Sequence, residues 1–339
     1  MPQFAPVRKG RKHKNLANIR ANTSTALPRT TNLCYNLAMR KCHLIQAIVA
    51  AGFLLVAGCL SQPPADAPRI KYIAHRGDYH DAPEGSMTAY RNAVARGSEI
   101  VKLDVHLSKD GVIVLSHDPS FKRTMGWDVK IADVTWDEIG RHVYLLDGKP
   151  TAERAVSLPE ALKVVGSIPE FWIDFKYFTP SFAEKVLAAF MAAGISQDRL
   201  MVATYSQPAL RYMKEHHPSI RRIGHMDFMQ VKGRWSPSFA RAKGVTYAAA
   251  GKGEPMSREV VDGISDYASK MGLWGVNIGQ NPKLVTKELV AALKAKGLWV
   301  SIALIHTKSQ AEHYVGFEND AVVTRDRLAV RSVLEKEQK

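Results

Sequence analysis

Cysteine is scarce in this 339-residue chain and is confined to its N-terminal part. The three cysteines are Cys34, Cys42 and Cys59, and none follows residue 59. The remainder of the chain therefore has no disulfide, no thiolate metal site and no cysteine nucleophile. Any enzymatic chemistry there has to rest on other side chains.

Acidic residues are absent from residues 1–41, which contain nine of the 47 lysines and arginines. The formal net charge is +15, so only six positive charges remain for everything after residue 41. That excess is ordinary for a segment of this length, and it argues against a nucleic-acid partner for the chain. Residues 1–38 are predicted to be a basic leader. It is either disordered or the result of a wrongly assigned translation start, with Met39 as the real one.

The apolar run 44–57 is too short to span a bilayer. It follows a short basic region and precedes small residues and Cys59, a pattern that resembles a bacterial lipoprotein signal. We therefore expect a signal peptide at 39–58, a lipid anchor at Cys59, and a Pro-rich flexible tether at 59–69. This predicts a location in the cell envelope, on the periplasmic or extracellular face. The alternative is a buried apolar helix that contains a cysteine by chance.

Short apolar runs alternate with amphipathic segments from residue 70 onward. Strands are predicted at 71–74, 100–105, 171–175, 200–204, 220–224, 274–278, 298–304 and 320–324. Capping and stop signals predict helices at 86–97, 157–166, 180–193, 257–271 and 284–296. Alternating strands and helices indicate a parallel sheet, and eight repeats suit an α/β (β/α)8 TIM barrel over residues 70–335. A ninth strand-like run at 245–248 leaves the count open.

Two irregular segments interrupt this alternation. The residues 109–111, Lys-Asp-Gly, predict a tight hairpin turn after the second strand. The stretch 121–156 reads as an insertion with little regular structure that forms a lid or pocket wall.

Two histidine motifs carry the chemistry of the chain. The first is His75-Arg76-Gly77, and the second is His117-Asp118. Histidine titrates near neutrality, so one imidazole can accept a proton while the other donates one. The planar guanidinium of Arg76 fits phosphate oxygens. The set predicts cleavage of a phosphodiester.

These motifs carry a resemblance to the glycerophosphodiester phosphodiesterase family. It is specific in IAHRG (73–77), APE (82–84), LDVHLSKDG (103–111) and LSHD (115–118), and it continues in WIDFK (172–176) and VTRD (323–326). The resemblance implies hydrolysis of glycerophosphodiesters, or related alcohol phosphodiesters, to an alcohol and glycerol phosphate. It also implies a small-molecule substrate and a divalent cation, Ca²⁺ or Mg²⁺, held by carboxylates.

The sequence departs from the family at the expected metal site. The family places a Glu two residues before the Asp of strand two and a Glu in strand three, where this chain has Lys102 and Asp174. One hypothesis is that Lys102 replaces the cation between Asp104 and Asp174, as an arginine does in a related class of bacterial phosphoinositide lipases. A second is that Glu84, Asp104 and Asp174 still hold a metal. A third is a degenerate site that binds phosphodiesters or sugar phosphates without turnover.

The site residues are expected at the carboxyl ends of the strands. We expect His75 to be the general base and His117 the general acid, an order that sequence alone leaves reversible. Arg76 and Lys102 would stabilise charge on the phosphate, and substrate would contact Arg76, Glu84 and Lys176. His225 and His306 follow strands five and seven, and each is expected to be either a pocket residue or a structural one.

Overall fold

The computed structural model describes residues 70–231, 234–237 and 258–336, all within one compact unit, Pro68–Lys339. The predicted leader, signal peptide, anchor at Cys59 and tether lie outside the described residues, as does the run 245–248. No helix in the described ranges is long and apolar enough to cross a membrane.

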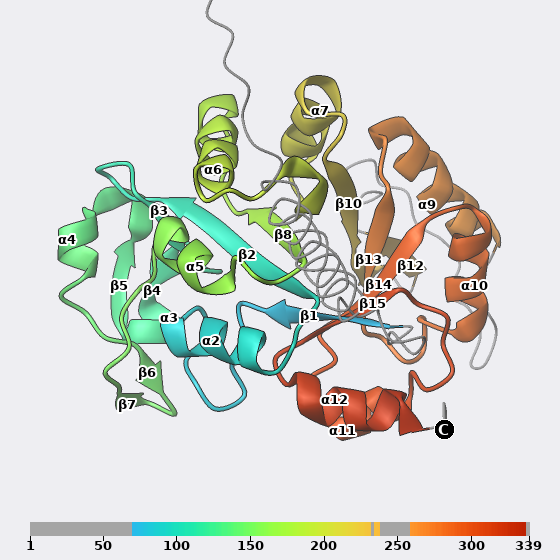
Figure 1. Ribbon diagram of the computed structural model, residues 1–339. Helices are drawn as coiled ribbons and strands as arrows, with labels where there is room; N and C mark the ends of the chain where they lie inside the picture. The colour runs from blue at the N-terminus through green and yellow to red at the C-terminus, as the bar shows by residue number, and fades with distance from the viewer. Residues whose placement is uncertain (1–69, 232–233, 238–257, 337–339) are drawn as a thin grey trace, which may run out of the picture. The chain divides into compact units, whose positions relative to one another are not determined.

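Eight parallel strands form a closed barrel. They are β1 (Lys71–His75), β2 (Ile100–Leu107), β8 (Glu170–Phe175), β9 (Leu200–Thr204), β10 (Arg221–Met226), β13 (Gly275–Gly279), β14 (Trp299–Ala303) and β15 (Ala321–Thr324). Each strand pairs with its neighbour, and β1 pairs with both β2 and β15, which closes the sheet (Figure 1). The (β/α)8 prediction is confirmed, with strand bounds close to those expected.

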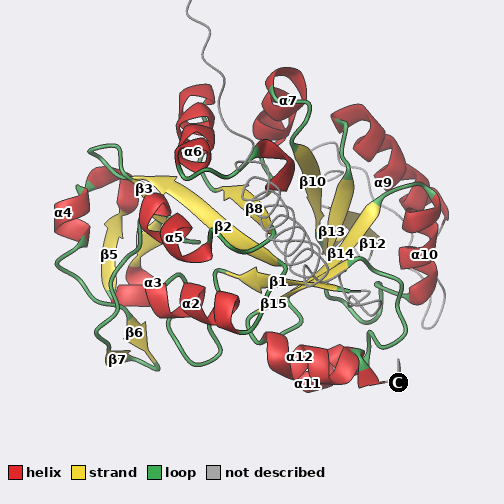
Figure 2. Ribbon diagram, viewed as in Figure 1, coloured by secondary structure: helices red, strands yellow, loops and turns green. Residues whose placement is uncertain are grey.

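Helices cover the outside of the strands (Figure 2). They are α2 (Met87–Ala95), α5 (Leu158–Val165), α6 (Pro180–Ala192), α7 (Gln207–His216), α9 (Arg258–Met271), α10 (Lys287–Ala295), α11 (Lys308–Glu312) and α12 (Arg327–Leu334). Ser86 caps α2 as predicted, because its Oγ accepts a hydrogen bond from the N–H of Ala89. The helix predicted from residue 284 begins later, because Thr286 caps α10 in the same way.

The predicted turn at 109–111 joins β2 to β3 (Ile113–Leu115), which runs antiparallel to it. Gly111 adopts a φ of +84°, a conformation that favours glycine. Ser108 braces the turn, since its Oγ accepts a hydrogen bond from the N–H of Val112 at 2.8 Å. The hairpin prediction is confirmed, and the turn returns the chain toward His117.

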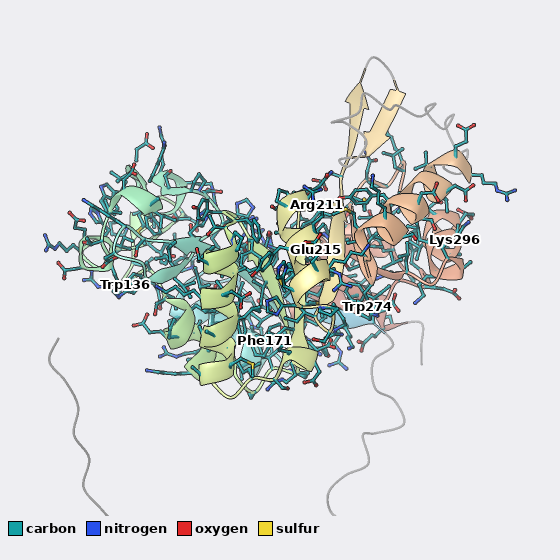
Figure 3. The ribbon with its side chains drawn as sticks, turned by 90° about the horizontal axis from the view of Figure 1, so that it is seen from above. Trp136, Phe171, Arg211, Glu215, Trp274 and Lys296 are labelled. Carbon is teal, nitrogen blue, oxygen red and sulfur yellow. The ribbon has the colours of Figure 1, made fainter. Side chains whose placement is uncertain are left out.

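The stretch 121–156 contains more regular structure than expected. Its elements are short: β4 (Ser120–Phe121), α3 (Lys122–Met125), β5 (Trp127–Lys130), a 3₁₀ turn (Ile131–Asp133), α4 (Trp136–Ile139), β6 (Leu145–Leu146) and β7 (Lys149–Pro150). Phe121, Ile131, Ile139 and Tyr144 belong to a separate small core beneath them. Turn-sized elements of this kind are held by that core and carry little periodicity of their own. In Figure 3, Trp136 of this segment lies across the barrel from Lys296 after α10.

Side chains inside the barrel change from apolar to polar along the strands. The apolar interior cluster consists of Ile73, Ile100, Trp172, Met201, Ala203, Ile223, Trp299, Ala321 and Val323. Two residues farther along their strands, the same inward positions hold His75, Lys102, Asp174, His225 and Ser301. The barrel therefore ends in a polar layer at its carboxyl end, where the predicted site residues were expected.

Candidate active site

The end of β1 turns sharply at the His-Arg-Gly motif. Arg76 has a φ of +55° and Gly77 a φ of +83°, both in the left-handed region. A Cβ at residue 77 would lie 2.6 Å from the backbone carbon of Ala89, so only glycine fits there. A left-handed arginine is strained, and strain of this kind is typical of functional sites. The turn presents His75 to the barrel interior and Arg76 to the loop that follows.

Glu84 joins this loop to Arg76. Its carboxylate accepts hydrogen bonds from Nη1 of Arg76 at 2.8 and 2.9 Å, and the N–H of Gly85 donates to the carbonyl of Arg76 at 2.9 Å. Arg123 of α3 binds the same carboxylate through two nitrogens, at 2.6 and 3.0 Å. Glu84 therefore lies between two guanidinium groups.

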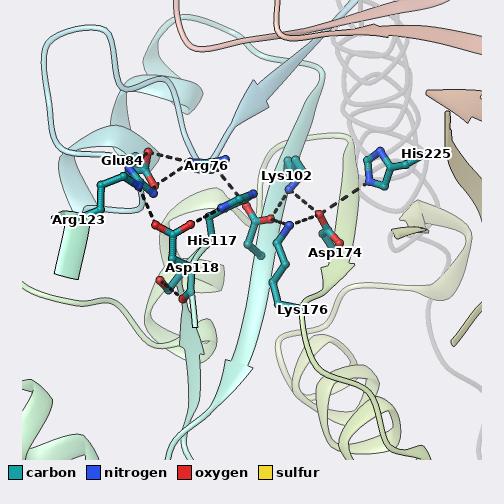
Figure 4. Close-up of polar contacts among 11 residues, drawn as sticks. Arg76, Glu84, Lys102, His117, Asp118, Arg123, Asp174, Lys176 and His225 are labelled. Atoms are coloured by element: carbon teal, nitrogen blue, oxygen red, sulfur yellow. Dashed lines mark hydrogen bonds and ion pairs between the residues drawn. The ribbon is translucent and has the colours of Figure 1, made fainter. Parts of the chain in front are cut away.

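Two lysines and two aspartates form a closed network inside the barrel mouth (Figure 4). Lys102 Nζ pairs with Asp104 and lies 2.9 Å from Oδ2 of Asp174. Lys176 Nζ lies 3.0 Å from Asp104 Oδ1 and 2.7 Å from Asp174 Oδ2. Asp104 and Asp174 face each other in the register of β2 and β8. We call these four residues the charge square.

The charge square fixes the protonation of its carboxylates. Burial alone would raise the pKa of Asp104, but Lys102, Lys176 and Arg76 hold it well below the usual range of a carboxyl group. The same two lysines outweigh burial at Asp174 and lower its pKa. In return, the two carboxylates outweigh burial at Lys176 and raise its pKa. All three groups are charged at neutral pH.

His117 is held by its sequence neighbour. Its Nδ1 lies 2.7 Å from Oδ1 of Asp118, and Oδ2 of Asp118 accepts a hydrogen bond from Nε of Arg123 at 2.7 Å. Burial, Lys176 and Arg76 outweigh Asp104 and Asp118, so the pKa of His117 lies below its usual value. The His117 side chain is 36% exposed, so its outer edge is open to a ligand.

His75 is more deeply buried than His117. Burial, Arg76 and Lys102 together hold its pKa well below its usual range, so the ring is neutral. Among the described residues its buried Nδ1 has no hydrogen-bond partner. The ring stacks on His306, with centroids 5.5 Å apart. His306 is itself oriented by the N–H of Arg325, which donates to its Nδ1 at 3.2 Å.

Three hydrogen-bonded side chains on β14, β13 and β10 form a chain inside the barrel. Ser301 Oγ donates to Asn277 Oδ1 at 2.8 Å, and Asn277 Nδ2 donates to Nδ1 of His225 at 3.0 Å. The other ring nitrogen of His225 therefore carries the proton, and it lies 3.8 Å from Oδ2 of Asp174. Burial lowers the pKa of His225 to about 4. His225 and His306 both face the site.

A small cavity lies among these groups, with Arg76, Glu84, Asp104, His117 and Thr124 in its wall. The space open to a water-sized sphere is about 10 Å³, which is room for about one water molecule. The cavity therefore has no room for a phosphate group.

A family model for the glycerophosphoryl diester phosphodiesterase family matches residues 75–327, well over half of the chain. This chain belongs to that family. The match begins at His75 and ends at Arg327, so it spans the barrel from the end of β1 to the start of α12.

Two relatives within the family share part of the chain. A glycerophosphodiester phosphodiesterase from Caldanaerobacter subterraneus subsp. tengcongensis is 28% identical over 160 residues, 44% of this chain and 63% of its own length. Human glycerophosphodiester phosphodiesterase 1 is 42% identical over 71 residues, 21% of this chain and 22% of its own length. In both cases the chain covers less than two thirds of the relative.

Two solved structures show the same fold. An Oleispira antarctica phosphodiesterase, in complex with the product sn-glycerol-3-phosphate, matches with a TM-score of 0.61 at 22% identity, over 78% of this chain and 97% of its own. A glycerophosphodiester phosphodiesterase from Agrobacterium tumefaciens matches with a TM-score of 0.60 at 17% identity, over 78% of this chain and all of its own.

The donor set does not fit the divalent cation that the family resemblance implies. Among the described residues no three His, Cys, Asp or Glu side chains form a group that could hold a metal ion. Asp104 and Asp174 lie together, but two ammonium groups contact one oxygen of each, Oδ1 of Asp104 and Oδ2 of Asp174. Glu84, the third predicted ligand, is engaged by Arg76 and Arg123. A cation between the aspartates would meet two like charges.

The structure brings the predicted site residues to one end of the barrel, and it gives a role there to two residues, Asp118 and Arg123, to which the sequence had assigned none. Asp118 was part of the quoted motif, and its contact with His117 follows from adjacency in the chain. Arg123 carries no signal in the sequence, because its position depends on the fold of the segment 121–156. Lys102 and Asp104 are two residues apart in β2 and therefore lie on one face of the strand, where they form an ion pair.

Proposed function

We propose that this protein hydrolyses glycerophosphodiesters, or related alcohol phosphodiesters, to an alcohol and glycerol phosphate. The observation that carries the proposal is that Arg76 is the common charged neighbour of two imidazoles that lie in different environments. His75 is buried and neutral, whereas His117 is paired with Asp118 and partly exposed. A base and an acid that share a neighbouring guanidinium suit proton transfer at phosphate.

Family membership and the geometry support the following mechanism. The neutral His75 takes a proton from water as the water oxygen bonds to phosphorus. The bond from phosphorus to the alcohol oxygen breaks, and His117 gives its proton to that oxygen. Binding of the anionic phosphate favours the imidazolium form of His117, as Asp118 already does. Attack by a neighbouring hydroxyl of the substrate needs the same two imidazoles and gives a cyclic phosphate first.

The rest of the site binds and orients the phosphate. Arg76 supplies guanidinium donors, and Glu84 holds that guanidinium in place together with the backbone contact of Gly85. Arg123 links Glu84 to Asp118, so the positions of Arg76 and His117 depend on each other. Lys102 and Lys176 add positive charge beside the developing oxyanion.

The full-length protein can be assayed for release of sn-glycerol 3-phosphate from glycerophosphocholine, glycerophosphoethanolamine, glycerophosphoglycerol and glycerophosphoinositol. We expect turnover of at least one of them, with His117→Ala slower by about 10²–10⁴-fold. Absence of turnover on every substrate, with binding retained, would instead support a phosphodiester-binding or sugar-phosphate-binding protein on the same barrel.

We also propose that the chain is a lipoprotein of the cell envelope, anchored through Cys59. The basic, apolar and small-residue pattern of 39–58 supports this, as does the Pro-rich segment after it. Mass spectrometry of the protein expressed in a bacterium should find a lipid on an N-terminal Cys59. Cys59→Ala should abolish it, and an unmodified product that begins at Met1 in the cytoplasm would contradict the anchor.

A further inference from the structure

The charge square is unusual because it places four charged side chains in the interior of a barrel. Lys102 and Asp104 side chains are 6% and 2% exposed, and Asp174 is 3% exposed. Burial of charge costs free energy unless each group is paired, and here each lysine contacts both aspartates. The four charges sum to zero, so the square is self-contained, with its two positive charges fixed in position.

The donors of the square are not exhausted by its carboxylates. Each ammonium has three N–H groups, and its two ion pairs with Asp104 and Asp174 engage at most two of them. At least one N–H of each lysine is therefore not directed at these carboxylates. Lys176 follows the last residue of β8 and is 16% exposed, against 6% for Lys102. Its remaining donor is the one nearer to the open end of the barrel.

The two ammonium groups are associated with different imidazoles. Lys102 is the register partner of His75 in the pairing of β2 with β1, and its charge acts on that ring. Lys176 acts on His117 instead, where it is the largest charge that lowers the pKa of the ring. Each positive charge of the square thus acts on a different imidazole of the proposed acid–base pair.

We infer that Lys102 and Lys176, held between Asp104 and Asp174, form a fixed dication that replaces the divalent metal. Lys176 contacts the phosphate of the substrate, and Lys102 positions that phosphate. This inference rests on the proposed function. Two ammonium groups carry the charge of one divalent cation, and they need no oxygen ligands beyond the two aspartates. The positive charge is present before the substrate binds, so no metal ion has to be recruited and no charged group has to be reorganised.

Chelator sensitivity tests the inference directly on the full-length protein. Hydrolysis of a glycerophosphodiester is expected to be unchanged in excess EDTA and unchanged by added Ca²⁺ or Mg²⁺. Turnover that disappears with EDTA and returns with either metal would overturn it, and would leave Glu84, Asp104 and Asp174 as the candidate ligands.

Lys176→Met tests the phosphate contact, since methionine keeps the apolar stem and removes the charge. We expect kcat of the folded protein to fall by about 10²-fold or more, and the thermal midpoint to fall as well, because Asp104 and Asp174 each lose a paired charge. Lys176→Arg should restore part of both. Lys163→Met, on the exposed face of α5, is the matched control and should behave as wild type. Unchanged kcat in Lys176→Met would refute the contact.

Lys102→Glu tests the positioning role, because it rebuilds the carboxylate pair of the family. Its turnover in EDTA should fall by a similar factor and recover in part with Ca²⁺ or Mg²⁺, a response that a purely structural role would not give. Full turnover of this variant in EDTA would contradict the inference.

Calorimetry separates failure of the inference from failure of the proposed function. If no substrate is turned over, binding of sn-glycerol 3-phosphate to the full-length protein still tests whether the charge square binds a phosphate without a metal ion. Binding that EDTA leaves unchanged and that Lys176→Met weakens by about tenfold or more would support the dication. Binding that requires Ca²⁺ or Mg²⁺ would overturn it.

Discussion

Nδ1 of His117 lies 2.7 Å from Oδ1 of Asp118, while Nε of Arg123 holds the other oxygen of that carboxylate at the same distance. The contact directs the proton of Nδ1 toward Asp118 and leaves Nε2 of the imidazole for the substrate. It also counteracts burial and the nearby cations, all of which lower the pKa of His117.

Asp118→Asn should shift the alkaline limb of the pH–rate profile to lower pH. The carboxylate raises the pKa of His117, so its loss lowers that pKa, and the acid is deprotonated at a lower pH. The profile of kcat/KM measures the shift. An alkaline limb at the wild-type position would show that another group, and not His117, is the acid.

Arg76→Lys should reduce kcat/KM by about 10- to 100-fold, because one ammonium cannot reproduce the paired donors of the guanidinium. Glu84 would also lose its two hydrogen bonds from Nη1. Steady-state kinetics measure the loss. Equal kcat/KM values in both proteins would mean that Arg76 acts only as a point charge.

Gly77→Ala should lower the free energy of unfolding by about 1–3 kcal/mol more than Gly194→Ala does. Both glycines have a positive φ, +83° and +74°, so both variants carry the same backbone strain. Only residue 77 would also place its Cβ 2.6 Å from the backbone of Ala89, since nothing lies within 4 Å at residue 194. Urea denaturation measures the difference, and equal losses would contradict the steric argument.

The free energy of unfolding should fall as the pH is lowered from about 6.5 to about 4. Burial lowers the pKa of both His225 and His306 to about 4, whereas both are protonated below about 6.5 once the chain unfolds. In that window the unfolded chain binds more protons, which favours unfolding at the lower pH. His306→Asn should reduce the slope, and denaturation curves at several pH values check it. A slope identical to wild type would contradict the assignment.

The barrel and most of its site follow from the sequence for definite physical reasons. Strand alternation places Lys102 and Asp104 on one face, and the carboxyl ends of parallel strands meet at one end of the barrel. The helix α7 was not predicted, although Ser206 caps it, a proline stands in its first turn, and its buried positions Ala209, Leu210 and Met213 have helical spacing. The helix α11 has only five residues, too few to show a period.

The contacts that the segment 121–156 makes could not be predicted from the sequence. Arg123 reaches Glu84 and Asp118 only because the small core around Phe121 and Tyr144 positions α3. The participation of Lys176 in the charge square also needed the structure. Alternation places Lys176 on the same face as Asp174. Only the pairing of β2 with β8 brings Oδ1 of Asp104 to 3.0 Å from Nζ of Lys176.

A double-mutant cycle on the two imidazoles tests the central claim most directly. The measurement is kcat/KM for glycerophosphodiester hydrolysis by wild type, His75→Ala, His117→Ala and the double variant. Each single variant should lose about 10²–10⁴-fold, and the double variant should lose far less than the product of the two, because both rings act in one transition state. Near-normal activity of either single variant would contradict the two-imidazole mechanism.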